Sequence, residues 1–415
     1  MPDISLPWGA WYHEALHTVR LPDDWRVDTL SPCGSTACSE RDVARAIENP
    51  IDSPPLCELA RDRKTACIVV DDLARPTRAD ELLPPVLDQL HAAGLAEEAV
   101  RIVVATGTHA PLGPTQLDCK LGADIVSRYR VESHDCAQPL AATGILYGKR
   151  ELRVNRTFFE SDLKIALGSV LPHSFAGYSG GAKLVLPGLA DAEATSRSHK
   201  FVLLGLRGGS GLEGNRFRSE AEQLARRLGL SFVVCAVPGA ERKTLGVFAG
   251  DVVAAHRRAC AEAETVFRTE LSSDYDCLIL NAYPKDIDLI QSENVFVALK
   301  RAKTPVVASD GVIVLTSAAS EGVGRHGLFE PGGLSYRAPV KKRALGGREL
   351  WLYVPNVPTD DVRKLFWSGY PVFHDAHELE QALAKRLGKS ARAAVVPMAP
   401  MQQLHDVREG DSKSD

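Results

Sequence analysis

The chain has 415 residues, of which 45% are hydrophobic and 25% are charged, and its formal net charge is −4. This length exceeds what one hydrophobic core usually spans, so two domains are expected. The weakly acidic balance gives no electrostatic case for a nucleic-acid partner and favours a small-molecule ligand.

The first residues and the apolar runs bear on location in the cell. Residues 1–9 contain neither a basic region nor a long apolar core, so no signal peptide is indicated. No later run approaches the roughly 18 apolar residues of a membrane-spanning helix. We therefore expect a cytoplasmic protein with no membrane partner. The nine cysteines lack paired Cys-x-x-Cys spacing, which argues against a zinc ribbon or a disulfide framework.

Short apolar runs alternate with helical patterns along the first part of the chain, which is typical of α/β units with largely parallel strands. In such sheets ligands gather at the carboxyl ends of the strands. Strands are expected at 66–70, 101–105, 163–167 and 231–236, and helices at 79–93, 217–228 and 251–267.

A polar stretch at 268–276 precedes a second series of α/β elements. Here we expect a strand at 277–280, a helix at 293–301 with Ser292 as its N-cap, and a strand near 305–308.

The predicted architecture is two α/β domains with largely parallel sheets and the active site at the domain interface. Residues 1–268 would form the catalytic and cofactor-binding domain, and residues 276–400 would form the C-terminal α/β domain. Residues 401–415 read as a polar tail.

Polar clusters follow the first two expected strands. Asp71 to Thr77 follows the first strand, and Thr106 to His109 follows the second. Arg75 is a candidate carboxylate clamp because a guanidinium group can bond both oxygens at once; the alternative is a surface ion pair with Asp71 or Asp72.

The segment from His173 to Gly188 sets a histidine and a lysine around a glycine-rich turn. Its spacing is close to a phosphate loop, but no Ser or Thr follows Lys183 to hold magnesium, which argues against a nucleotide triphosphatase. Gly180 and Gly181 permit positive φ and leave amide N–H groups unshielded, which suits a phosphate or a carboxylate. The alternative is a plain glycine turn with a solvated lysine.

Three histidines, His109, His173 and His199, stand near glycine or polar turns. A lone histidine is more often a hydrogen-bonded structural residue than a catalyst, and we interpret His134 in that way. Three histidines beside a lysine and an arginine favour chemistry. Because imidazole titrates at about pH 6.5, a pair could move protons on opposite faces of one substrate, and a third could bind a metal.

These motifs, in this order, resemble the nickel-dependent lactate racemase family. The resemblance rests on residues 71–77, 106–109 and 173–188 and on His199, and it extends over residues 6–251. Members of that family hold a nickel pincer nucleotide, a pyridinium mononucleotide whose two sulfurs and ring carbon bind nickel.

The resemblance implies a role for each reactive side chain. Lys183 would attach the cofactor covalently through a thioamide, and His199 would be the protein's nickel ligand. His109 and His173 would be the paired acid–base groups.

It also implies residues that bind without reacting. Arg75, with Asp72, would orient substrate or cofactor anions. The backbone of Ser179, Gly180 and Gly181 would cradle a phosphate.

The substrate-binding helix of the family resembles this chain only in part. Gln291 is kept, but Ile290 stands where the family has tyrosine and Asn294 where it has lysine. Trp367 would match a C-terminal tryptophan of the family. Gln291, Asn294 and Trp367 are therefore candidate substrate contacts, and the substrate need not be lactate.

The predicted function is a racemase or epimerase of 2-hydroxy acids that works by reversible hydride transfer to a lysine-tethered nickel pincer nucleotide. Two alternatives stay open: a hydride-transfer redox or lyase enzyme with the same cofactor, and a non-catalytic nickel or nucleotide carrier. The implied partners are the small-molecule 2-hydroxy acid and the proteins that make the cofactor and insert nickel. The oligomeric state is left open.

Overall fold

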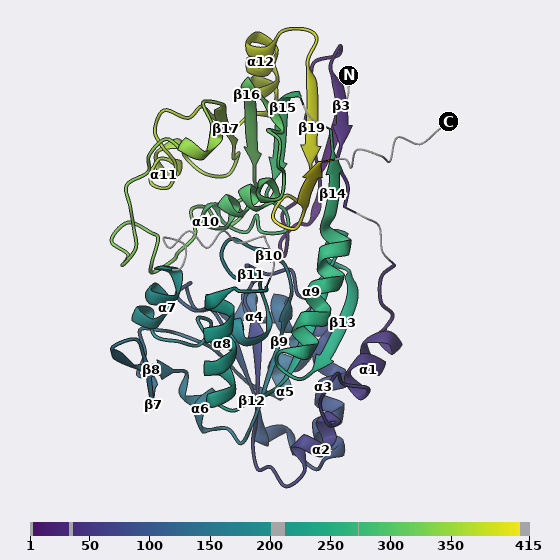
Figure 1. Ribbon diagram of the computed structural model, residues 1–415, viewed down its shortest axis with the longest axis vertical. Helices are drawn as coiled ribbons and strands as arrows, with labels where there is room; N and C mark the ends of the chain where they lie inside the picture. The colour runs from purple at the N-terminus through teal and green to yellow at the C-terminus, as the bar shows by residue number, and fades with distance from the viewer. Residues whose placement is uncertain (1–2, 33–35, 201–211, 273, 407–415) are drawn as a thin grey trace. The chain divides into compact units, whose positions relative to one another are not determined.

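The chain forms two compact units. The computed structural model describes residues 3–32, 36–200, 212–272 and 274–406 (Figure 1). What we call the central unit consists of residues 35–263 and 325–335, and the terminal unit consists of residues 1–34, 264–324 and 336–415. Each unit contains its own largely parallel sheet, so the predicted α/β class is confirmed.

A six-stranded sheet forms the core of the central unit, in the order β13-β12-β9-β4-β5-β6. All neighbours pair in parallel except β12 and β13, which are antiparallel. Strands β4 and β9 are buried at every residue, as expected for continuous apolar runs with both faces covered. The strands are β4 (Ala66–Asp71), β5 (Val100–Ala105), β6 (Arg130–Ser133), β9 (Leu163–Ser169), β12 (Leu230–Pro238) and β13 (Thr244–Gly250).

Helices cover this sheet (Figure 1). Apolar side chains of α1, α2 and α3 join Ile68 and Val70 of β4 in one hydrophobic core. The helix α1 begins with a capping box between Ser39 and Asp42, which satisfies amide groups of its first turn. The helices are α1 (Glu40–Glu48), α2 (Leu56–Ala60), α3 (Ala79–Ala92), α4 (Pro114–Leu121), α5 (Ala123–Arg128), α6 (Arg156–Glu160), α7 (Ala192–His199), α8 (Arg216–Arg227) and α9 (Ala254–Phe267), which runs past the end of the unit.

The terminal unit has a second six-stranded sheet, in the order β18-β17-β16-β15-β19-β3, and every neighbouring pair is parallel. Its strands are β3 (Arg26–Thr29), β15 (Tyr275–Asn281), β16 (Val307–Thr316), β17 (Glu349–Tyr353), β18 (Val372–Phe373) and β19 (Arg392–Val396). Its helices are α10 (Leu289–Ser292), the 3-10 helix η5 (Glu293–Lys300), α11 (Thr359–Val362) and α12 (Ala376–Leu387).

Four two-stranded sheets complete the described structure. Three are antiparallel, and the pair β14 with β20 is parallel. They are β1 (Asp3–Trp8) with β2 (Ala15–Arg20), β7 (Ala141–Tyr147) with β8 (Arg150–Val154), β10 (Pro172–His173) with β11 (Gly177–Tyr178), and β14 (Arg268–Leu271) with β20 (Gln403–Asp406).

The expected strands and helices of the central unit are confirmed with small shifts at their ends. The helix expected at 293–301 is the 3-10 helix η5, and Ser292 stands at its N-cap position but forms no side-chain capping hydrogen bond. The chain is already helical at Ser292, because α10 begins one turn earlier: the Asp288 carboxylate accepts from the Gln291 backbone amide, and the Ser292 hydroxyl donates to the Asp288 carbonyl. The strand expected near 305–308 begins at Val307 and continues to Thr316.

The ends of the chain are grouped differently from the division predicted at 268–276. The strand β3 pairs with β19, so the first 34 residues belong with the C-terminal elements. Within the predicted polar tail, Gln403–Asp406 forms β20, which pairs with β14. Residues 407–415 lie outside the described part of the chain.

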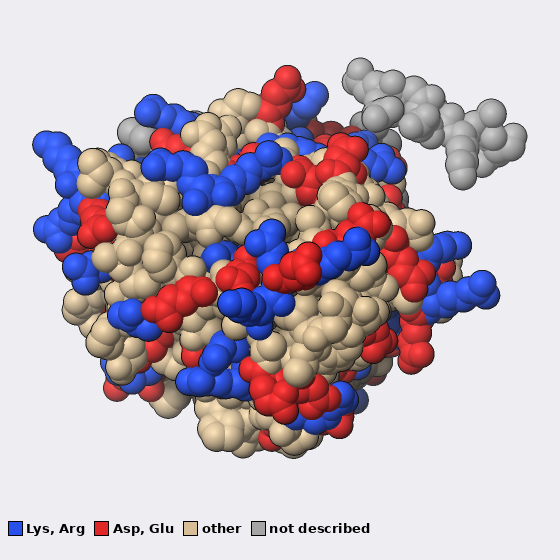
Figure 2. Space-filling view, turned by 90° about the horizontal axis from the view of Figure 1, so that it is seen from below, with Lys and Arg blue, Asp and Glu red and all other residues tan. Residues whose placement is uncertain are grey.

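Other expectations concern charge, cysteines and membranes. On the face drawn in Figure 2, basic and acidic side chains are interspersed rather than gathered by sign. The eight cysteines within the described residues are all free. No helix in the described ranges is both long enough and apolar enough to cross a bilayer.

Candidate functional site

The residues singled out in the first part of the sequence meet at one edge of the central sheet. Asp71 ends β4, and Thr106 and His109 follow β5, so parallel pairing of these strands brings both loops to the same edge. Beyond β9 the chain turns into the glycine-rich segment. A cavity of about 100 Å³ lies among these segments. It is lined by Asp71, Asp72, Arg75, Ala105, Thr106, Gly107, Thr108, His109, His173, Ser179, Gly180, Lys183, Leu184, Pro187, Gly188, Thr195, His199 and His326.

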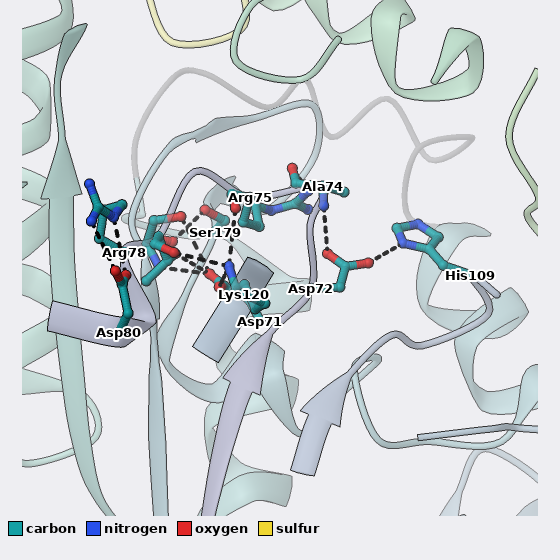
Figure 3. A network of polar contacts seen from close by, with 11 residues as sticks. Asp71, Asp72, Ala74, Arg75, Arg78, Asp80, His109, Lys120 and Ser179 are labelled. Carbon is teal, nitrogen blue, oxygen red and sulfur yellow. Dashed lines mark hydrogen bonds and ion pairs between the residues drawn. The ribbon is translucent and has the colours of Figure 1, made fainter. Parts of the chain in front are cut away.

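Asp72 and His109 form a hydrogen-bonded pair through Oδ2 and Nδ1 (Figure 3). The other carboxylate oxygen accepts from the Ala74 amide at 3.2 Å. Burial acts to raise the pKa of Asp72, but the charge and hydrogen bond of His109, together with the charges of Arg75 and Lys120, outweigh burial and lower that pKa. Because Asp72 is ionised, Nδ1 of His109 donates to it. The proton exchanged with a ligand would then move through Nε2 of His109.

Arg75 does not form the ion pair that the alternative interpretation expected. Its Nη1 donates to the Ala74 carbonyl at 2.9 Å, and in the described chain no ion pair joins it to Asp71 or Asp72. Asp71 pairs instead with Lys120, whose Nζ lies 2.8 Å from Oδ1. The Arg75 guanidinium therefore lines the cavity beside the Asp72 and His109 pair (Figure 3).

Lys120 fixes the loop that carries Arg75. Its side chain is fully buried, and Nζ donates to the carbonyls of Arg75 and Thr77 at 3.1 and 3.2 Å. Asp71 also accepts from the Thr77 hydroxyl at 2.7 Å and the Ser169 amide at 2.9 Å. Sequence reasoning missed Lys120, because a lysine in an amphipathic helix is usually a solvated residue.

Lys183 also lines the cavity, and it is in contact with His173. Its Nζ is 2.8 Å from Nε2 of His173, and both side chains are buried. The same Nζ lies 5.1 Å from the ring centre of Phe175 and 5.6 Å from that of Phe217. Lys183 is only 9% exposed, so the alternative of a solvated lysine is wrong.

The glycine turn before Lys183 has no room for side chains. Gly180 and Gly181 have φ values of +74° and +59°, as the sequence suggested. A Cβ on Gly180 would lie 2.9 Å from the Ser169 carbonyl oxygen, and one on Gly181 would lie 2.9 Å from the His256 ring. Any larger residue would displace the backbone that carries Lys183.

Two buried side chains bind the backbone carbonyls of this turn. Arg218 is fully buried and donates to the carbonyls of Tyr178 and Gly180, the latter at 3.1 Å. His256 is hydrogen-bonded to the Ser179 carbonyl at 2.8 Å. Sequence reasoning found neither residue, since their role exists only when α8 and α9 pack against the turn.

Ser179 is occupied within the turn itself. Its amide donates to the Leu171 carbonyl at 2.8 Å, and its hydroxyl donates to the Ser169 carbonyl at 2.7 Å. The predicted phosphate cradle of Ser179, Gly180 and Gly181 therefore cannot rely on the amide or hydroxyl of Ser179, and it stays a prediction for the glycines.

His199 ends α7 with its ring facing the cavity. Its Nδ1 lies 2.8 Å from the Thr195 carbonyl, to which it donates, so Nε2 carries the lone pair. Burial lowers the pKa of His199 to about 4, while the bond to Thr195 acts in the opposite direction. A neutral imidazole with one nitrogen oriented by a carbonyl is a suitable metal ligand.

His326 is a cavity residue that the sequence did not identify. Its ring centre lies 4.7 Å from that of His109 and 6.5 Å from that of His199. Burial lowers the pKa of His326 well below its usual value, and the charges of His109 and His199 act in the same direction. The signal available was a histidine between glycines at 324 and 327, which is too common a pattern to stand out.

The three candidate substrate contacts of the C-terminal half lie in the terminal unit. The side-chain amide of Asn294 donates to the backbone carbonyl of Gln291 at 2.7 Å, and the backbone amide of Gln291 donates to the Asp288 carboxylate at 2.7 Å. Trp367 packs edge-on against Tyr370 with ring centres 5.3 Å apart. Their contact with a substrate stays a prediction.

His134 has the structural role expected of it, and it predicts a pH dependence. Its ring is fully buried, with Nε2 3.2 Å from the Ala190 carbonyl, and burial lowers its pKa to about 4. In the unfolded chain the His134 side chain has a pKa of about 6.5, so between pH 6.5 and pH 4 it is protonated when unfolded but neutral when folded. The free energy of unfolding therefore decreases as the pH falls from about 6.5 towards 4. We expect the titration of His134 to lower the free energy of unfolding by roughly 3 kcal/mol over that pH range.

Urea unfolding of wild type and His134→Gln at pH 7.5 and pH 4.5 tests this expectation. Glutamine can keep the bond to Ala190 but cannot titrate, so the variant should lose less stability between the two pH values. Equal losses in both proteins would show that His134 does not drive the pH dependence.

The family model for the lactate racemase N-terminal domain matches residues 12–209. The lactate racemase of Thermoanaerobacterium thermosaccharolyticum is 29% identical, over 79% of this chain and 77% of that protein. The lactate racemase of Lactiplantibacillus plantarum is 31% identical, over 79% of this chain and 78% of that protein. The chain belongs to the lactate racemase family.

Solved structures show the same fold. The apoprotein of the Thermoanaerobacterium thermosaccharolyticum lactate racemase matches with a TM-score of 0.74 at 23% identity, over 97% of this chain and 99% of that chain. A crystal structure of a protein from Thermotoga maritima matches with a TM-score of 0.67 at 16% identity, over 89% and 99%. The resemblance to the lactate racemase family and the predicted fold class are thus both confirmed.

Proposed function

We propose that this member of the lactate racemase family racemises or epimerises 2-hydroxy acids with a lysine-tethered nickel pincer nucleotide. The observation that carries the proposal is a single cavity with two histidines in different settings. His109 is held by Asp72 on one side, and His173 contacts Lys183 on the other. Inversion by hydride transfer suits two such groups, since the hydride leaves one face of C2 and returns to the other, and the hydroxyl proton is taken by one histidine and given back by the second.

The residues present fit the proposed cofactor. Lys183 places a buried amine in the cavity, His199 offers Nε2 as a metal ligand, and Gly180 lines the same cavity. We therefore assign Lys183 as the covalent attachment point and His199 as the nickel ligand. When bound, the pyridinium ring of this cofactor supplies an acceptor for hydride from a carbon whose hydrogen is too weakly acidic for a protein base.

His109 is assigned the first proton transfer. Asp72 holds its Nδ1–H, so Nε2 takes the hydroxyl proton of the substrate as C2 becomes a planar ketone. The guanidinium of Arg75, which lies in the same cavity, is assigned to the substrate carboxylate, where a planar fork can bond both oxygens.

His173 is assigned the proton transfer on the other face. Its Nε2 contacts Nζ of Lys183 in the structure. Acylation of Lys183 would convert its amine into an amide-like nitrogen, so Nε2 of His173 would lose this contact with an amine and could turn to the substrate. The residues must hold the carboxylate while the rest of the ketone rotates.

The substrate class proposed is a 2-hydroxy acid, and lactate is one member of it. Gln291, Asn294 and Trp367 are proposed as further contacts. Asn294 carries no charge where a cation was expected from the resemblance, which favours an acid with more hydroxyl groups than lactate.

A chiral assay on loaded protein tests the proposal. The protein would be co-expressed with cofactor-making and nickel-inserting proteins and given single enantiomers of lactate, malate, phenyllactate and sugar acids in deuterated buffer. We expect conversion to the opposite configuration at C2, with the C2 hydrogen retained because hydride does not exchange with solvent.

Other outcomes are informative. Deuterium at C2 would indicate direct proton abstraction instead of hydride transfer. Net formation of a keto acid or an alkene would indicate a redox enzyme or a lyase. Protein that carries nickel and the cofactor but converts none of the acids would contradict the proposed reaction.

A further inference from the structure

Residues 325–335 belong to the central unit, although they follow β16 in the sequence, and His326 in this segment lines the cavity. His326 and His109 face each other in an antiparallel bridge, and the Gly327 amide donates to the Thr108 carbonyl at 2.8 Å. This backbone pairing fixes the position of the His326 ring relative to the loop that carries His109.

The other end of the segment is fastened to α7. The Ser335 hydroxyl lies 3.3 Å from the Ser196 hydroxyl. The ring of Phe329 packs against two histidines: its centre lies 4.7 Å from that of His326 and 5.5 Å from that of His199. The segment therefore contacts both the loop that carries His109 and the helix α7 that ends at His199.

The hydrogen bonds of His326 define which ring nitrogen carries the proton. Nδ1 accepts from the Leu328 amide at 3.2 Å and lies 3.3 Å from the Thr108 hydroxyl. A nitrogen that accepts from an amide cannot also bear a hydrogen, so the hydrogen is on Nε2.

That Nε2–H is a donor available to a ligand. Among the residues that the structure describes, none accepts a hydrogen bond from it. The side chain is only 7% exposed and lines the cavity. Its ring meets that of His109 edge-on, with an angle of 67° between the planes. This donor is largely buried and has no protein partner among the described residues, so either water or an acceptor atom of a bound ligand must satisfy it.

We propose that His326 donates from Nε2 to the C2 oxygen of the hydroxy acid. This inference rests on the proposed function and adds a substrate contact to it. A hydroxyl oxygen has one hydrogen and two lone pairs. With the hydrogen given to His109 and one lone pair bonded to His326, the hydroxyl group has a single orientation.

The same contact would favour the oxidised form of the substrate. As the C2 oxygen becomes a carbonyl oxygen, it has no hydrogen left and becomes acceptor-only, so the bond from His326 is kept while that to His109 reverses direction. A donor that binds the ketone better than the alcohol lowers the barrier rather than only KM.

Two substitutions separate the donor from the loop contact. In His326→Gln, the amide nitrogen can reach the place of Nε2, whereas in His326→Asn the amide oxygen can take the place of Nδ1 and accept from Leu328. His326→Asn thus keeps the hydrogen bond from the Leu328 amide but loses the donor to the substrate. His326→Gln keeps the donor but loses the bond from Leu328.

We expect His326→Asn to lower kcat about tenfold, the worth of one hydrogen bond, with a smaller change in KM. Competitive inhibition by the matching 2-keto acid should weaken by a similar factor, and His326→Gln should rescue part of both effects. Thermal unfolding should show His326→Asn to be at least as stable as His326→Gln. Equal kinetic losses in the two variants, or a loss that follows stability, would overturn the proposal.

A readout without turnover separates this inference from the proposed function. In protein labelled with ¹⁵N-histidine and lacking the cofactor, the ring nitrogen shifts should show a neutral His326 with its hydrogen on Nε2. A hydrogen on Nδ1 would overturn the inference even if the protein racemises hydroxy acids. Wild type that carries the cofactor but racemises nothing would contradict the proposed function instead, whatever the tautomer of His326.

Discussion

Replacement of Lys183 by alanine will remove the cofactor adduct and, with it, the reaction. We expect the tryptic peptide that carries residue 183 to have no added mass and racemisation to fall by about 10⁶-fold or more, to the uncatalysed level. The reason is that the amine of Lys183 is the proposed attachment point in a buried cavity. Mass spectrometry of the peptide and nickel analysis of the whole protein measure the two parts separately.

Lys183→Arg is the matched control for this change. A guanidinium keeps a positive charge near His173 and the rings of Phe175 and Phe217, but it is too weak a nucleophile to be acylated. It should therefore fold like wild type and still lack the adduct. A Lys183→Ala protein that keeps nickel and full activity would show that the cofactor is attached elsewhere or not at all.

Replacement of either cavity histidine will separate the two halves of the reaction. We expect His109→Asn and His173→Asn each to lower racemisation by about 10²- to 10⁴-fold, the usual effect of losing a general acid or base. Cofactor loading should be retained in His109→Asn, because His109 lies by Asp72 and not by Lys183.

The two variants should also differ in which enantiomer they still oxidise. Each histidine is proposed to serve one face of the substrate, so each variant should form enzyme-bound keto acid from one enantiomer and not from the other. Single-turnover experiments with each enantiomer would show this. If both variants fail equally with both enantiomers, the histidines do not act as a pair.

Asp72→Asn gives a graded version of the same test. The asparagine can still contact Nδ1 of His109 but carries no charge to stabilise a protonated ring. Its loss of rate should be smaller than that of His109→Asn, and the double variant should be no worse than His109→Asn alone, since the two residues act as one unit.

The cavity of the central unit was largely predictable because its residues follow successive parallel strands. Asp72 and His109 are distant in the sequence, but β4 and β5 are neighbours in register, so their following loops had to meet. The glycine turn was predictable for a different reason, since positive φ at Gly180 and Gly181 requires residues without a side chain.

What the sequence missed depends on contacts between distant segments. Lys120, Arg218 and His326 look ordinary in their local context, and each acquires its role only through packing against another loop. Ser292 stands at the N-cap position of η5 but makes no side-chain cap, because the chain becomes helical earlier, at α10, where the Asp288 carboxylate caps the first turn.

The pairing of β3 with β19 sets an order for folding during synthesis. The central sheet is complete once β13 has left the ribosome, so that part of the chain can fold early. The strand β3 is made before any of it, yet its partner β19 (Arg392–Val396) is made only after the whole central sheet. The segment that carries β3 must therefore wait until Arg392–Val396 has been made before it acquires its neighbour, and a chaperone that shields it would raise the yield of folded protein.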